Sequence, residues 1–114
     1  MSGELKTVHI AKEEWLRFAD RFTLDNEGWP ATVEIVAPEL GAQEEAEAVP
    51  FVALTYDAKH EGEFIITIGR EPDLVDHQVD DPEEVWVEET EDGRPMALAI
   101  RSKDGTQTIL HFHD

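Results

Sequence analysis

The sequence predicts an α+β domain in which one N-terminal amphipathic helix is followed by about six antiparallel strands. Two patterns indicate this class. The segment Lys12–Leu24 carries apolar residues at helical spacing, and alternating apolar runs fill most of the chain after it. Short strands of this kind favour a strongly bent sheet or a small β-barrel, because closure removes exposed strand edges. The alternative is an open meander with the helix across one face.

The helix and the segment after it are delimited by spacing and turn residues. The apolar positions of the helix form one stripe, Trp15, Phe18, Ala19 and Phe22, which we expect to lie on the sheet. Asn26 and Gly28 supply the stop signal. Ala31–Ala37 then alternates as a strand does, whereas Pro38–Ala48 is polar and self-repelling. We expect a mobile loop there, with a turn or two of helix as the alternative.

The central strands are predicted from a second set of alternating runs. Val49–Asp57 and Glu63–Gly69 are expected to pair across a turn, and Leu74–Val79 forms a weaker strand. The inward residues of the second strand are Phe64, Ile66 and Ile68. Their partners on the first strand are either Phe51 and Ala53, or Val52 and Leu54.

Two Asp-Gly turns predict a three-stranded meander made of Glu83–Thr90, Pro95–Arg101 and Thr106–His113. A two-residue turn at Asp92-Gly93 pairs Val87 with Leu98. A three-residue loop at Lys103-Asp104-Gly105, with a glycine bulge, pairs Leu98 with Leu110. These registers place Val87, Leu98 and Leu110 on the core face. The residues on the other face of the meander are then Trp86, Ala97, Ala99, Ile109, His111 and His113. A three-residue first turn would instead move Trp86 into the core.

Composition narrows the functional classes. The chain has 114 residues, which we take as a single domain spanning residues 1–114, and its net charge is −18 from 27 acidic and 9 basic residues. Such a charge repels phosphates and anionic lipids, so we expect neither nucleic-acid nor membrane binding. Solubility, in a salt-rich cytoplasm such as a halophile's, explains the charge, and mimicry of nucleic acid is the alternative. There is no cysteine for a disulfide or thiol chemistry, and a cytoplasmic location is expected.

Several segments together resemble a known family. They run from Ile10 to Trp15, through Phe22 and Gly28-Trp29, to Val33–Ile35, and resume with Leu74–Val79, an Asp/Pro turn, Val85–Glu88 and Lys103–Thr106. This pattern is similar to DUF5335, an uncharacterised bacterial family whose function is unknown. Asp76 stands where that family often has threonine. The resemblance implies a cytoplasmic bacterial protein and supplies no catalytic residues.

Candidate chemistry is sparse. His111 and His113 lie two residues apart and so share a strand face, where they could hold a divalent metal with a third ligand from His77, Asp76 or Asp80. We interpret them instead as ordinary surface residues, and His77 as a core histidine, because such coordination needs three or four ligands. No serine triad or phosphate-binding glycine motif is present. We therefore predict no enzymatic activity, no metal and no cofactor.

The leading hypothesis is a non-enzymatic binding domain that acts through an apolar patch. The patch is formed by Trp86, Ala97, Ala99 and Ile109. Its occupant is an unknown protein partner or a second copy of the chain. One alternative is an acidic mimic that inhibits a basic protein. Another is a metal protein or enzyme built around His77, His111 and His113.

Overall fold

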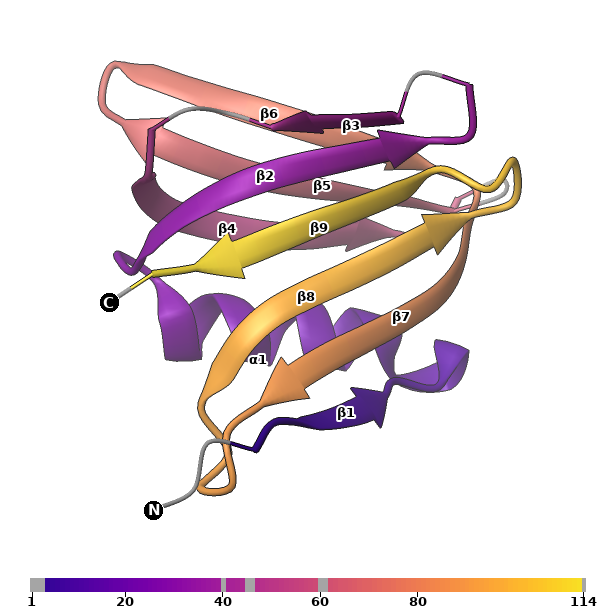
Figure 1. The fold of residues 1–114 in the computed structure, drawn as a ribbon, viewed down its shortest axis with the longest axis horizontal. Helices are drawn as coiled ribbons and strands as arrows, with labels where there is room; N and C mark the ends of the chain where they lie inside the picture. The colour runs from indigo at the N-terminus through magenta and orange to yellow at the C-terminus, as the bar shows by residue number, and fades with distance from the viewer. Residues whose placement is uncertain (1–3, 40, 45–46, 60–61, 114) are drawn as a thin grey trace.

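The computed structural model describes residues 4–39, 41–44, 47–59 and 62–113 (Figure 1). The elements run in chain order as β1 (Lys6–His9), a 3-10 turn (Lys12–Glu14), α1 (Trp15–Asn26), β2 (Pro30–Ala37), β3 (Gly41–Glu44), β4 (Val49–Asp57), β5 (Glu63–Arg70), β6 (Asp73–Asp80), β7 (Pro82–Glu89), β8 (Pro95–Ser102) and β9 (Gln107–Phe112). The α+β class and the N-terminal helix are confirmed.

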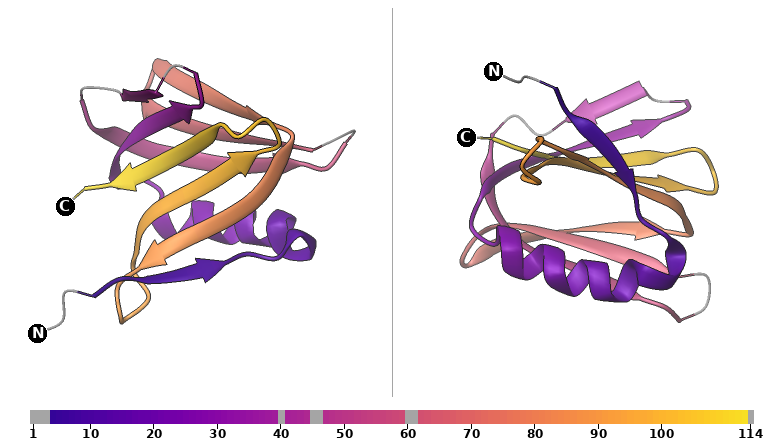
Figure 2. Two further views of the ribbon diagram at one scale, coloured as in Figure 1. Left: turned by 45° about the vertical axis from the view of Figure 1, so that its right-hand side comes forward. Right: turned by 90° about the horizontal axis from the view of Figure 1, so that it is seen from below.

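The sheet is strongly bent, and the bend creates two layers. Neighbouring strands follow the order β1-β7-β8-β9-β2-β4-β5-β6, while β3 pairs with β2 off this path, and each pairing is antiparallel. A front layer, β1 to β2, faces a rear layer of β4, β5 and β6 (Figures 1 and 2). The two layers join where Pro30 and Ala31 pair with Pro50 and Val49. Within the described residues the two end strands, β1 and β6, do not pair with each other, so the sheet is open and the predicted closed barrel is ruled out.

The prediction of about six strands was too low, because the described residues form nine. β1 precedes the helix and was missed, since in Lys6–His9 only Val8 is even partly buried. β3 lies inside the segment predicted as a loop, where Gly41–Glu44 pairs with β2. Its sequence carries no apolar alternation, and it is a strand because its backbone pairs with β2. Residues 40, 45 and 46 of that segment lie outside the described residues.

The core lies between the two layers and α1. The helix buries Trp15, Ala19 and Phe22 against the sheet, as its apolar stripe predicted. The rear layer contributes Phe51, Leu54, Phe64, Ile66, Ile68 and Val79, and the front layer contributes Ala31, Val33, Val85, Val87, Leu98, Ile100, Leu110 and Phe112. Phe51 and Leu54 are both inward because the register shifts between Phe51 and Ala53. Each of the two predicted alternatives for this strand was therefore half right.

The edge of β4 opposite β5 is covered by α1 and the segment that follows it. The N–H of Phe51 donates to the carbonyl of Trp29 (2.8 Å), and its carbonyl accepts from the N–H of Gly28 (2.7 Å). One turn earlier, the hydroxyl of Thr23 accepts from the N–H of Leu54 (2.9 Å) and donates to its carbonyl (3.0 Å). The helix thus satisfies backbone groups that an exposed strand edge would leave open.

Both Asp-Gly turns are three-residue loops. At the second, the N–H of Ser102 donates to the carbonyl of Thr106, as predicted. At the first, the N–H of Thr90 donates to the carbonyl of Arg94, so the predicted two-residue turn was wrong. The predicted pairing of Val87 with Leu98 is nevertheless confirmed, because the register shifts by one residue next to Met96. Trp86 therefore stays off the core.

Candidate functional site

The outer face of the front layer carries the residues of the predicted patch. Backbone pairing places His9, Trp86, Ala99, Ile109 and Glu34 in one row across five strands. The adjacent row contains Thr7, Glu88, Ala97, His111 and Thr32. The rows point outward because the residues between them, such as Val87 and Leu98, are buried. This is the broad face toward the viewer in Figure 1.

The four residues singled out from the sequence lie together on this face. Trp86, Ala97, Ala99 and Ile109 are each half-buried, and with Thr7, Glu88 and His111 they line one hollow of about 330 Å³. The lining combines two small side chains of β8, Ala97 and Ala99, with larger ones from β7 and β9 on either side in the sheet order. The sequence-predicted patch is therefore a concave apolar surface on β7, β8 and β9, which we call the outer hollow.

Polar pairs surround the outer hollow. The imidazole Nε2 of His9 lies 2.7 Å from a Glu84 oxygen, and that of His111 lies 2.9 Å from Glu34. Arg101 ion-pairs with Glu83 (3.2 Å) and holds its guanidinium carbon 5.7 Å from the Trp86 ring centroid. Exposed pairs of this kind contribute little to stability, about 0–1 kcal/mol each. They do form a charged rim around an apolar centre.

The histidines proposed as metal ligands are not brought together. His111 and His113 lie two residues apart at the end of β9, but Nε2 of His113 is 3.0 Å from the Thr32 hydroxyl. His77 lies on β6, half-buried, and three strands separate β6 from β9 in the sheet order. Asp76 accepts a hydrogen bond from Thr67 (2.6 Å), and Asp80 accepts one from Gln78 (2.9 Å). Among the described residues, no three His, Asp or Glu side chains converge as a metal site would require.

Two aspartates in the turns are tuned by local hydrogen bonds. The Thr90 hydroxyl donates to Asp92, and this bond is the main cause that lowers the pKa of the Asp92 carboxyl. The N–H of Thr106 donates to Asp104 (2.9 Å) and lowers the pKa of that carboxyl. Both groups are fully exposed turn residues. These shifts reflect turn geometry, and each aspartate acts as an acceptor that fixes its loop.

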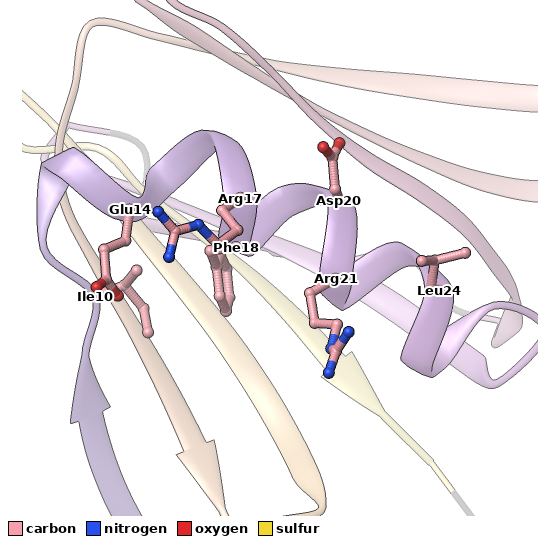
Figure 3. A pocket seen from close by; sticks show the side chains of 7 residues that line it. All are labelled: Ile10, Glu14, Arg17, Phe18, Asp20, Arg21 and Leu24. Atoms are coloured by element: carbon pink, nitrogen blue, oxygen red, sulfur yellow. The ribbon is translucent and has the colours of Figure 1, made fainter.

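Sequence reasoning missed a second hollow, which lies along α1. It has a volume of about 510 Å³ and is lined by Ile10, Glu14, Arg17, Phe18, Asp20, Arg21 and Leu24 (Figure 3). We call it the helix groove. A neighbouring hollow shares Ile10, Phe18 and Arg21 with it and extends to Trp29, where the Arg94 guanidinium stacks 4.4 Å from the ring centroid. The signal in the sequence was Leu24, an apolar residue outside the buried stripe that is 76% exposed.

Comparison with known proteins adds relatives but no activity. The model of a family of unknown function, DUF5335, matches residues 6–114. An uncharacterised protein of Aquifex aeolicus (strain VF5) is 35% identical over 108 residues, which cover 95% of this chain and 93% of that protein. No solved structure matches the chain. In the described part of the chain, α1 and the 3-10 turn are too short and too polar to cross a membrane.

Proposed function

Because the chain belongs to the DUF5335 family, whose function is unknown, we propose from its geometry that it is a non-enzymatic binding domain. It holds a protein partner on the outer face of β1, β7, β8, β9 and β2. The observation that carries this proposal is the outer hollow, where Trp86 and Ile109 stand beside two alanines on a half-buried surface. Tryptophan is among the residues enriched in binding hot spots, and such residues are surrounded by a polar rim.

The size of the face favours a protein over a small molecule. The five strands of the face are four to eight residues long, and at about 3.4 Å per residue and about 4.8 Å between strands the face covers about 550 Å² in projection. Stable interfaces bury about 800 Å² on each partner. The outer hollow of about 330 Å³ is at the small end of ligand sites and suits one anchoring side chain.

Charge indicates the chemistry of the partner. The chain carries a net charge of −18, so long-range attraction favours a partner whose rim is basic. Glu84, Glu88 and Glu34 lie on the outer face and would meet such a rim, while the apolar anchor enters the outer hollow. In this proposal the charge assists the encounter and the hollow provides specificity. A cytoplasmic location is part of the same proposal.

Site-specific photo-crosslinking tests the proposal. A photoreactive residue is placed at Ala99 or Ile109 in cells that produce the protein, with Leu74 on β6 as the matched exposed control. We expect one partner, with a basic surface, to be captured from both outer-face positions and not from position 74. Capture of the same protein from all three positions would contradict the proposal.

The partner identified in this way is then titrated against a variant. Ala99→Arg fills the outer hollow with a charged side chain, and we expect its affinity to fall at least tenfold while circular dichroism stays unchanged. Ile109→Ala should cause a smaller loss in the same direction. If Ala99→Arg binds normally and affinity depends only on salt, the acidic-mimic hypothesis replaces this proposal. Capture of a second copy through the outer hollow would instead make this face a homodimer interface.

A further inference from the structure

The helix groove has a charge pattern that the outer face lacks. Glu14, which directly precedes α1, and Phe18 and Arg21 within it are four and three residues apart, so they form one stripe along the helix. Figure 3 shows all three directed to the same side of the helix, with Asp20 on the opposite side. Glu14 and Arg21 are exposed and Phe18 is half-buried. The stripe therefore carries an acid at one end, a base at the other and an aromatic ring between them.

Such a stripe is complementary to itself when reversed. If a second α1 lies antiparallel across the first, with the twofold axis between Arg17 and Phe18, Glu14 of each copy faces Arg21 of the other. The two Phe18 rings then meet at the centre. In the same alignment Leu24 lies opposite position 11, next to Ile10, at the far end of the groove. Residue i meeting j and j meeting i is the rule of an isologous interface.

Leu24 supports this arrangement independently of the charges. It is 76% exposed, the most exposed of the large apolar residues in the described part of the chain. Ile10 and Phe18 line the groove and are only partly covered. Packing Leu24 of one copy beside Ile10 of another removes apolar surface from water on both sides, which favours association.

We propose that two copies of this chain associate through α1, antiparallel, with Glu14 paired to Arg21 across the interface and Leu24 in the partner's helix groove. This inference concerns a different face from the outer hollow and does not depend on the proposed function. Arg21 also pairs loosely with Asp25 of its own helix (3.7 Å), and its guanidinium has further donors for Glu14 of the other copy.

The strength of the dimer follows from its size and charge. α1 has twelve residues and is about 18 Å long, which places the interface at the small end of the known range. Two chains of −18 also repel each other until salt screens them. We therefore expect a dissociation constant on the order of tens of µM at about 0.5 M NaCl, and a weaker dimer at low salt.

A charge swap tests the proposal by sedimentation equilibrium at about 0.5 M NaCl. Arg21→Glu alone and Glu14→Arg alone each place like charges opposite each other twice, and should weaken self-association about tenfold or more. An equimolar mixture of the two variants restores both opposite-charge contacts, so heterodimers should form about as tightly as the wild type. The double variant should also self-associate normally. Arg70→Glu and Glu13→Arg change the net charge equally, lie outside the stripe and should leave the monomer–dimer equilibrium within about threefold of the wild type.

Two results would overturn the proposal. The first is a wild-type chain that stays monomeric up to about 1 mM in 0.5 M NaCl. The second is a dimer that responds to Arg70→Glu as strongly as to Arg21→Glu, or that the mixture fails to restore. Leu24→Ala adds a check that does not involve charge, because it should weaken the dimer without lowering the melting temperature of the monomer.

Discussion

Replacing Thr23 with valine should lower the stability of the fold, because it removes the side-chain hydrogen bonds that join α1 to the edge of β4. The Thr23 hydroxyl accepts from the N–H of Leu54 and shares its single proton between the carbonyls of Leu54 and Ala19, at 2.9–3.0 Å. Valine keeps the shape and removes the oxygen, so two partly buried backbone groups of Leu54 lose their partner. Each such loss costs about 1–1.5 kcal/mol, or about 2–3 kcal/mol together. With an unfolding entropy of roughly 0.24 kcal/mol/K for 114 residues, the melting temperature should fall by about 8–12 °C.

Urea unfolding monitored by circular dichroism measures this effect. Thr23→Ser keeps the hydroxyl and should lose less than half as much stability as Thr23→Val. Thr55→Val makes the same substitution at an exposed position of β4, the strand that Thr23 contacts, and serves as the control. A loss below about 0.5 kcal/mol for Thr23→Val would refute the reasoning, because water would then satisfy Leu54 as well as the threonine does.

The other predictions concern the turns and the charge. Gly69→Ala should lower the melting temperature far more than Gly93→Ala does. Both glycines have positive φ, but a Cβ at Gly69 would lie 2.6 Å from the Asp73 carbonyl oxygen, whereas a Cβ at Gly93 would have nothing within 4 Å. The pKa of the Asp104 carboxyl is lowered in the fold, so its ionised form stabilises the fold at pH values above the ordinary pKa of 3.8. This contribution is lost as the pH falls through the pKa of the folded state. Asp104→Asn should therefore flatten the acid-side pH dependence of Thr106 amide exchange. The melting temperature should rise between 0.01 and 1 M NaCl, because the Debye length falls from ~30 to ~3 Å and screens the −18 charges; a flat curve would mean that they are already well dispersed.

The meander and the outer hollow could be predicted because alternation and turn chemistry agreed. Each strand from β7 to β9 places apolar residues on the buried face, and a slip of one residue would expose them all. The sequence therefore specified which residues share the outer face, including Trp86 and Ile109. It did not specify that Ala97 and Ala99 would lie in a hollow, since this depends on neighbours from other strands.

The parts that could not be predicted depend on tertiary contacts. β1 and β3 are strands because a neighbour pairs with their backbone, and neither has a periodic apolar pattern. The helix groove needs Ile10 beside α1, where its N–H donates to Val85 of β7 (2.9 Å) and its carbonyl accepts from the Trp15 indole (3.0 Å). The inward positions of β4 depended on a register shift that the sequence does not mark. In each case the deciding interaction is a pairing or packing contact between elements, which no pattern within one element records.

The first Asp-Gly turn shows which signal dominates when two conflict. A three-residue loop without compensation would pair Val87 with Ala97 and place Trp86 opposite the buried Leu98. The extra residue is instead absorbed next to Met96, where the register shifts by one. Keeping Val85 and Val87 buried contributes about 1.5–3 kcal/mol for each side chain, more than the roughly 0.5–1.5 kcal/mol of one lost ladder hydrogen bond. Burial therefore overrides turn length, and the outer face of β7 exists because a single residue of β8 accommodates the difference.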